Sequence, residues 1–336
     1  MILYFAGNEP GAVDKVIMEN TSALKIDRLY SFLAWWKWDE SRWEEIHNKF
    51  IEFKQKNKFS RIIMDSGAHT ISGAFEKKAE NMAAMKELAL PLARKYLLFI
   101  RKFKDVVDAF FEVDTAPYTF SYEKQVEMRK AFFDEVGDPM KFIPVFHNRY
   151  DSNVRKVLED HIHNYPYVGI TGIHQEFNQS MFESYFEEIK KSGCKIHGLA
   201  VTAYEKMSEF PFYSVDSSSY LRQGITRTLL FFNHKTAETK TYSISHTGNN
   251  CIWAKCIEER QIILDYILFL KKKYGLDIPD DMHYLSEVQH TTGVDGYAIC
   301  IYNICSYLEC LEYINKHGHS FTEKKQGELF DLMEGK

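Results

Sequence analysis

Short apolar runs alternate with amphipathic stretches over the first 233 residues of the chain. The apolar runs are nearly continuous, which is typical of parallel strands that are covered on both faces. Between them, apolar residues recur at spacings of three and four, which predicts helices with one buried side. The predicted strands are 2–7, 28–33, 61–67, 109–114, 141–147, 167–172, 195–201, 212–217 and 228–233.

This alternation, repeated about eight times, favours an α/β fold, either a barrel or a doubly wound sheet. Nine candidate strands favour a TIM (β/α)8 barrel, because only one strand is then left over as an edge piece. After residue 240 the pattern changes to longer helices. We therefore predict a barrel over residues 1–240 and a helical extension packed on it over residues 241–336. The helices predicted in the extension are 253–274, 297–317 and 321–333.

Composition indicates a globular protein with enough apolar material for a large core. The 336 residues are 45% hydrophobic and 15% aromatic, and the formal net charge of −5 excludes a generally basic nucleic-acid binder. The most apolar stretch, LALPLARKYLLFI, is interrupted by Pro91, Arg94 and Lys95, and the N-terminus does not resemble a signal peptide. We expect a soluble, cytoplasmic protein without a membrane partner.

The six cysteines form no CxxC pair. The spacing of five between neighbours (251 and 256; 300, 305 and 310) separates them by about 140° around a helix, which does not direct their thiolates to one metal ion. We expect reduced, buried thiols and no structural zinc.

Three predicted strands end on an aspartate: Asp65, Asp114 and Asp216. A single aspartate at such a place is usually a turn or helix cap. In a barrel, however, the C-terminal ends of the strands surround one pocket, where mutual repulsion and burial separate carboxylate pKa values and assign different roles. Such a set fits nucleophilic and acid/base chemistry at a sugar C1′ carbon. On residue type alone it fits a divalent cation equally well, with His147 as a further ligand.

The order of several segments resembles the queuine/archaeosine tRNA-guanine transglycosylases, most closely the phage and bacterial relatives that insert 7-deazaguanines into DNA. The resemblance covers about residues 60 to 225. The segments that carry it are MDSGAHTISG (64–73), EVDTAP (112–117), VFH (145–147), VGITG (168–172), HGLAV (197–201) and YSVDSSSYLRQG (213–224).

The resemblance implies a TIM barrel that exchanges guanine for a 7-deazaguanine, such as 7-cyano-7-deazaguanine, without breaking the phosphodiester backbone. It implies that Asp216 attacks C1′ as the nucleophile and that Asp65 is the general acid/base. By the same motif, Asp114 accepts hydrogen bonds from the purine N1–H and amino group. The further residues that it assigns to the base are Ser66, Gly67, His147, Gly172, Gly198 and Leu199, and we assign Ser218 and Arg222 to the nucleic acid.

The departures from the family pattern bear on the substrate. Ala68 and His69 replace a glycine and an aromatic residue, and His147 or Asn148 stands in place of a glutamine. The CxCxxC…His zinc site of the tRNA enzymes is absent from ITRTLLFFNHKTAETKTYS, which favours DNA over tRNA as the polymer. The expected partners are DNA and the free 7-deazaguanine base, with no metal or cofactor, and a homodimer is compatible with the sequence.

Three alternatives stay open: a zinc-free tRNA-guanine transglycosylase, a non-catalytic nucleic-acid-binding barrel, and a nucleoside or glycoside hydrolase. Retention of all three aspartates argues against the non-catalytic barrel. His197 suits the rim or the core equally. The tryptophans Trp35, Trp36 and Trp38 could stack on a flipped base, although core or lid packing is the more common role.

Overall fold

The computed structural model describes residues 1–7, 11–56, 59–67, 82–113, 122–146, 154–170, 179–201, 203–245, 251–287 and 293–318. The chain groups into two compact units. The first unit contains Met1–Asp27, Lys56–Ser60 and Val201–Lys336, and the second contains Arg28–Gln55 and Arg61–Ala200. The domain boundary at residue 240 stays a prediction.

Nine of the described strands form one sheet in the order β5-β4-β3-β2-β1-β9-β8-β7-β6. The two strands at the ends of this order, β5 and β6, follow each other in the chain, so the sheet nearly closes on itself. The predicted α/β barrel with a helical C-terminal region is therefore confirmed. The strands are β1 Ile2–Ala6, β2 Ile26–Ser31, β3 Phe59–Asp65, β4 Ala109–Phe111, β5 Phe142–Ile143, β6 Val145–Phe146, β7 Tyr167–Ile170, β8 Lys195–Gly198 and β9 Ser214–Ser217.

The strand predicted over 141–147 is interrupted at Pro144, where it changes neighbours. Phe142 is in register with Phe110 of β4, whereas Val145 is in register with Gly169 of β7. Proline has no N–H to donate to a ladder, so the pairing with β4 cannot continue through it. The Pro144 carbonyl instead accepts the Gly169 N–H at 2.8 Å, which begins the pairing with β7.

A buried ion pair lies beside the junction of β5 and β6 at Pro144, in the second unit. Glu112, which follows β4, accepts the Val145 N–H through Oε1 at 2.6 Å. Arg129 donates to both carboxylate oxygens of Glu112, at 2.7 and 3.2 Å. The side chain of Glu112 is only 8% exposed, and that of Arg129 only 5%. The Glu112 carboxylate thus extends the β4 ladder by one acceptor, and Arg129 balances its charge.

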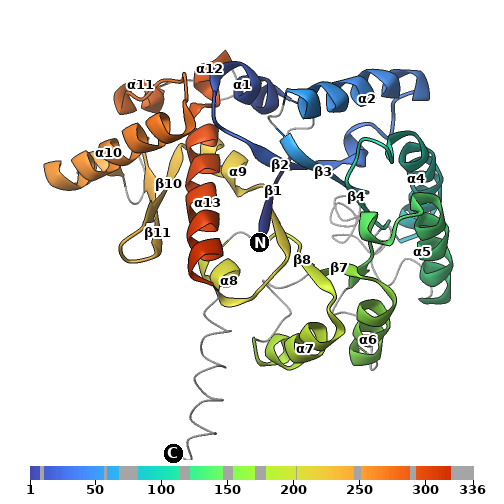
Figure 1. The fold of residues 1–336 in the computed structure, drawn as a ribbon. Coiled ribbons are helices and arrows are strands. Elements are labelled where there is room, and N and C mark those ends of the chain that lie inside the picture. The colour runs from blue at the N-terminus through green and yellow to red at the C-terminus, as the bar shows by residue number, and fades with distance from the viewer. Residues whose placement is uncertain are drawn as a thin grey trace, which may run out of the picture. The chain divides into compact units, whose positions relative to one another are not determined.

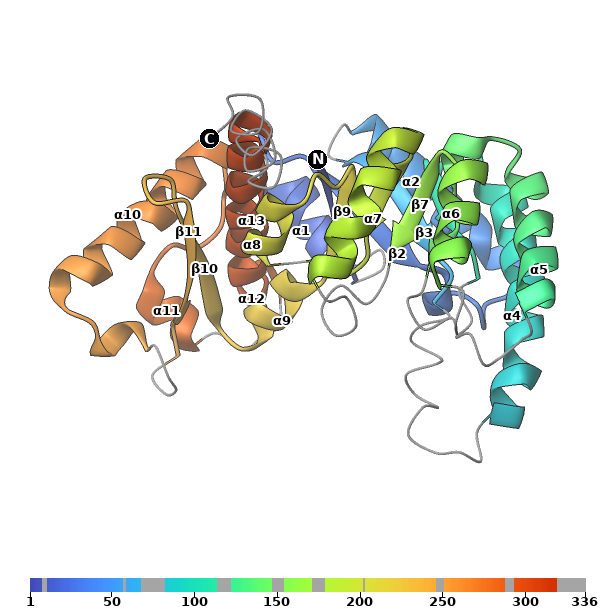
Figure 2. The same ribbon diagram turned by 90° about the horizontal axis from the view of Figure 1, so that it is seen from below.

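Helices follow the strands as the sequence pattern predicts. In the second unit α4, α5, α6 and α7 lie outside β4, β7 and β8 (Figures 1 and 2). The short helices α1, α8 and α9 were not predicted. The helices of the barrel region are α1 Ala12–Asn20, α2 Glu40–Gln55, α4 Met82–Phe103, α5 Tyr122–Val136, α6 Val154–Asn164, α7 Gln179–Ser192, α8 Tyr204–Glu209 and α9 Ser219–Ile225. Three-residue 3₁₀ turns occur at Phe32–Ala34, Pro139–Lys141 and Ile252–Ala254.

The ninth predicted strand, 228–233, is not part of the barrel. It is β10 (Thr228–Asn233), which pairs antiparallel with an unpredicted strand, β11 (Glu238–Ser243). The helices that follow this hairpin in the chain are α10 Ile257–Tyr274, α11 Met282–Glu287, α12 Gly293–Gly296 and α13 Ala298–His317. The predicted helix 321–333 lies outside the described residues. No helix in the described ranges combines the length and apolar character needed to cross a membrane.

Helix α13 satisfies the edge of β10 that faces away from β11. Asn303 accepts the Leu230 N–H at 2.7 Å and donates to the Thr228 carbonyl at 2.9 Å. Ser306 donates to the Leu230 carbonyl at 2.7 Å and in turn accepts from the Tyr266 hydroxyl. Because buried backbone groups are costly without partners, these side chains take the place of a further strand.

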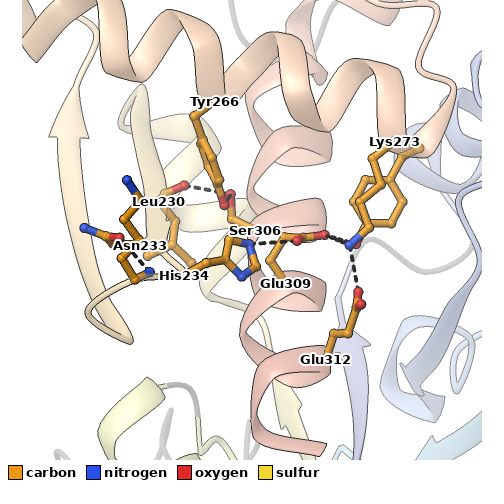
Figure 3. A network of polar contacts seen from close by, with 10 residues as sticks. Leu230, Asn233, His234, Tyr266, Lys273, Ser306, Glu309 and Glu312 are labelled. Carbon is orange, nitrogen blue, oxygen red and sulfur yellow. Dashed lines mark hydrogen bonds and ion pairs between the residues drawn. The ribbon is translucent and has the colours of Figure 1, made fainter. Parts of the chain in front are cut away.

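One turn further along α13, Glu309 has no exposed side-chain surface. Its carboxylate lies 2.6 Å from Lys273 Nζ and 2.9 Å from His234 Nε2, and it accepts the Tyr274 hydroxyl at 2.6 Å (Figure 3). Burial raises the pKa of Tyr274, and the hydrogen bond to Glu309 adds to the shift. Lys273 also pairs with Glu312 at 2.7 Å. The cluster therefore joins α10, β10 and α13 through one buried charge.

We expect Arg129→Met to lower the free energy of unfolding by about 3–5 kcal/mol, because it leaves the Glu112 carboxylate buried without its cation. The matched control is Lys130→Met on the same helix. Lys130 pairs with Asp134, but their side chains are 76% and 60% exposed, so its loss should cost less than about 1 kcal/mol. Urea unfolding measures both changes. Equal losses in the two variants would show that the Glu112–Arg129 pair does not stabilise the junction of β5 and β6.

The prediction of buried thiols is right for the three cysteines of α13, Cys300, Cys305 and Cys310. It is wrong for Cys256, which is exposed, and for Cys194 and Cys251, which are half-buried. Burial raises the pKa of the three α13 thiols, that of Cys300 to about 12. Since the thiolate is the reactive form, we expect a chromogenic disulfide reagent to modify Cys256 rapidly and the α13 thiols only after unfolding. The Cys256→Ser variant should lose the rapid phase. Rapid modification of the α13 thiols in the folded protein would contradict their burial.

Candidate active site

Asp216 is the third residue of β9 and is 9% exposed. In the parallel pairing with β1, Tyr4 is in register with Asp216, and Phe5 is in register with Ser217. The ring of Phe5 packs against Tyr220 of α9, with centroids 5.5 Å apart. Side chains alternate between the two faces of a strand, so Ser217 faces the helices and Asp216 faces away from them.

The segment after Asp216 turns directly into α9. The Ser219 N–H donates to Ser217 Oγ at 3.2 Å, which orders the turn. Ser218 and Arg222, which we assigned to the nucleic acid, are both exposed. Their exposure leaves them accessible to a phosphate, as that assignment requires.

Asp65 ends β3 in the second unit, where Met64 is in register with Phe110 of β4. Its Oδ2 accepts the Gly67 N–H at 2.9 Å, a common turn in which an aspartate caps the backbone two residues later. The Tyr96 hydroxyl lies 3.0 Å from the carbonyls of Met64 and Phe111. Burial raises the pKa of Tyr96, and the negative charge of Asp65 adds to the shift. A tyrosine that stays protonated therefore links β3 to β4 beside Asp65.

Gly67 follows in a conformation that favours glycine, with φ +80°. A Cβ atom there would lie 2.4 Å from Leu33 Cβ and 2.8 Å from Ser31 Oγ. The close approach at Gly67 is thus made to the chain's own side chains, which explains the glycine without a ligand. Ser66, beside it, is fully buried.

At the end of β8, Gly198 is buried and Leu199 is half-buried. The Leu199 N–H donates to the Ile170 carbonyl at 3.0 Å, so this amide already has an acceptor in the β7–β8 ladder. A base could therefore meet the carbonyl or side chain of Leu199 without breaking the ladder. A Cβ atom on Gly169 would lie 3.0 Å from Leu199 Cδ1 and 3.1 Å from Phe111 Cε1, so side chains from β4 and β8 converge over β7.

His197 and Trp35, whose roles the sequence left open, are core residues. His197 is fully buried and its ring meets Phe111 edge to face, with centroids 5.0 Å apart. Trp35 is 2% exposed and stacks on Phe99. Trp38 is half-buried, and the Arg42 guanidinium lies over its ring at 3.9 Å. Trp36 is half-buried as well, so Trp36, Trp38 and Arg42 have the exposure that contact with a ligand requires, whereas His197 and Trp35 do not.

Asp114, His147 and Gly172 lie outside the described residues. Within the described ranges, no group of three or more His, Cys, Asp or Glu side chains is arranged to hold a metal ion. Tyr96 and Glu112 are residues near the strand ends that sequence reasoning missed. In the sequence, Tyr96 cannot be distinguished from the other apolar residues on the buried face of a helix. The role of Glu112 cannot be recognised until its partner in α5, Arg129, is known.

Comparison of the chain with models of known protein families finds no match, and comparison with curated protein sequences finds none either.

We expect Gly67→Ala to destabilise the protein by more than Gly137→Ala. Both glycines have a positive φ, +80° and +73°, so both variants carry the same backbone strain of about 1–2 kcal/mol. Nothing lies within 4 Å of a Cβ on Gly137, whereas one on Gly67 overlaps Leu33 and Ser31, which adds about 1–3 kcal/mol. Thermal and urea unfolding measure the difference, and equal losses would refute the tight packing at Gly67.

Proposed function

We propose that the chain is a base-exchange transglycosylase that replaces guanine in DNA by a 7-deazaguanine through a covalent Asp216–C1′ intermediate. One observation carries the proposal: Asp216 lies near the C-terminal end of a parallel barrel strand, on the face turned away from the helices. In α/β barrels, catalytic groups stand at this end of the strands. The order of the strand-end motifs in the sequence adds the choice of reaction.

In the first half-reaction an Asp216 oxygen attacks C1′ of the target nucleotide. The C1′–oxygen bond forms, the C1′–N9 bond breaks, and guanine leaves with a proton supplied by Asp65. In the second half-reaction N9 of the incoming 7-deazaguanine attacks C1′ and releases Asp216, while its N9 proton returns to Asp65. Protons and electrons balance over the cycle, so the two carboxylates suffice for the chemistry.

The polymer must present the C1′ atom of the target nucleotide to Asp216. This atom is inaccessible while the base is stacked in a duplex. The target nucleotide therefore leaves the stack or comes from single-stranded DNA. Arg222 and Ser218 are exposed on and before the helix that follows Asp216, which suits contact with a backbone phosphate. The choice of DNA over tRNA rests on the cysteine-free segment after Ile225.

The decisive assay follows radiolabelled guanine into polymer, because base exchange incorporates guanine whatever 7-deazaguanine is the natural substrate. We expect label in DNA and none in tRNA. A parallel incubation with 7-cyano-7-deazaguanine, followed by digestion and mass spectrometry of the nucleosides, identifies the inserted base. Label in tRNA alone would favour the tRNA enzyme, and release of guanine without incorporation would favour a hydrolase.

Asp216→Asn should lower guanine incorporation at least about 1,000-fold, because the amide cannot form the glycosyl ester. The matched control is Asp265→Asn on α10, where an exposed carboxylate accepts from Gln261. Denaturing gels of the protein with labelled DNA should show a covalent band in the wild type and in the control. Full activity in Asp216→Asn would remove Asp216 from the mechanism.

A further inference from the structure

A surface of aromatic rings and cations follows strand β2, in the second unit. The strand leads through a 3₁₀ turn into the sequence WWKWDESR, residues 35–42, which runs into α2. Trp35 is buried in the core. Trp36 and Trp38 are half-buried, and Lys37 between them is exposed. One ring of the three therefore anchors the turn, and the other two keep part of their surface in contact with solvent.

The turn is held in a fixed shape. The Trp38 N–H donates to the Trp35 carbonyl at 2.9 Å, and Lys95 of α4 donates to the Trp38 carbonyl at 2.7 Å. The ring of Trp35 stacks on Phe99 of the same helix, with the two planes 10° apart. Because the turn is already ordered, a ligand that binds its rings does not have to order it.

Each exposed cation of this turn lies over an indole ring. Lys37 Nζ is 5.9 Å from the centroid of the Trp36 ring, and the Arg42 guanidinium carbon is 3.9 Å from that of Trp38. Neither cation has a carboxylate partner within the residues that the structure describes. The two lysines of α2, by contrast, are both paired: Lys49 with Glu45 at 3.0 Å and Lys54 with Asp108 at 2.8 Å.

Rings and unpaired cations together suit a single nucleic-acid strand. Bases of any sequence stack on an indole ring, and the cations bind the phosphates between them. A guanidinium that meets a ring through its face, as that of Arg42 does, keeps N–H groups at its edge for a phosphate. Asp39 and Glu40 are exposed beside these residues, so the local net charge is small. Stacking therefore contributes more to binding here than charge does.

The surface lies next to Asp65 within the same unit. A Cβ atom at Gly67 would lie 2.8 Å from Ser31 Oγ and 2.4 Å from Leu33 Cβ, so the C-terminal ends of β2 and β3 meet there. Trp36 follows Leu33 by three residues, which span at most about 11 Å. A strand whose target nucleotide lies beside Asp65 therefore has its flanking nucleotides within reach of Trp36.

We propose that Trp36, Lys37, Trp38 and Arg42 bind the single-stranded DNA that flanks the target nucleotide. The bases stack on the rings, and the cations bind the phosphates. The inference rests on the proposed function for the identity of the strand and for its place beside Asp65. Binding of a strand to this surface, however, can be measured without base exchange.

The first measurement is the binding of a fluorescently labelled thymidine oligonucleotide, followed by anisotropy. This probe contains no guanine, so its binding does not depend on base exchange. We expect Trp36→Ala to weaken binding about 5-fold or more. Trp36→Phe, which keeps an aromatic face, should retain most of the affinity.

The matched control for the ring is Phe269→Ala on α10. Phe269 is also an exposed ring with a lysine over it, Lys273 at 5.7 Å. This lysine is already paired with Glu309 and Glu312, so it is not available to a phosphate. Phe269→Ala should therefore bind the oligonucleotide as the wild type does.

The second measurement is the salt dependence of the same binding. Each phosphate that a cation neutralises on a single strand contributes about −0.7 to the slope of log K against log salt. We expect Arg42→Ala to make the slope shallower by about this amount. Lys49→Ala on the same helix should leave it unchanged, because Lys49 is paired with Glu45.

Three results of the binding measurements would overturn the proposal. The first is a wild-type protein that does not bind the oligonucleotide. The second is tighter binding of a duplex, whose bases are already stacked on one another, than of the single strand. The third is losses in Phe269→Ala and Lys49→Ala as large as those in the variants of the proposed surface.

The kinetics of guanine incorporation separate this inference from the proposed function. In an active enzyme, Trp36→Ala should raise the KM for single-stranded DNA about 5-fold or more with kcat unchanged, because the surface holds the flanking strand and not the reacting atoms. An unchanged KM would overturn the proposal and leave the function standing. A wild type that binds the oligonucleotide but performs no base exchange refutes the proposed function and leaves the surface as a nucleic-acid site.

Discussion

Closure of the barrel sheet depends on one short segment, residues 142–146, in which β5 pairs with β4 and β6 pairs with β7. Pro144 in its middle cannot donate a hydrogen bond, so the change of neighbours is built into the chain. The Glu112 carboxylate receives the first N–H after the proline, and Arg129 neutralises the buried charge. Removing either side chain leaves the other buried without compensation, which is why this pair, unlike the exposed ion pairs, matters for stability.

In the first unit, the buried polar side chains of helix α13 have a role comparable to that of the Glu112–Arg129 pair. Every residue from Ala298 to Tyr307 is buried, and polar side chains of α13 complete different elements. Asn303 and Ser306 satisfy the edge of β10, while Glu309 gathers Lys273, Tyr274 and His234. A hydrophobic helix that carries so many buried polar groups specifies its neighbours as well as packing against them, because each group needs its own partner.

The strands of the barrel were predictable because a continuous apolar run between turn residues has few other uses in a chain of this length. The same pattern misplaced residues 228–233, which are equally apolar but pair with β11 in a hairpin. Strand β11, with the sequence ETKTYS, has too little apolar character to be recognised alone. The short helices α8, α9 and α11 were missed because six or seven residues give too few turns for a periodicity to appear.

The sequence by itself determined the fold class and two of the strand-end carboxylates, Asp65 and Asp216, because hydrophobic periodicity and the ends of strands are local properties. Only the tertiary structure decided that His197 and Trp35 belong to the core, that Gly67 is needed for packing on Leu33, and that the ring of Tyr307 packs on Phe5. These are contacts between segments far apart in the chain. Their partners are set by packing and burial, which no local pattern of residues records.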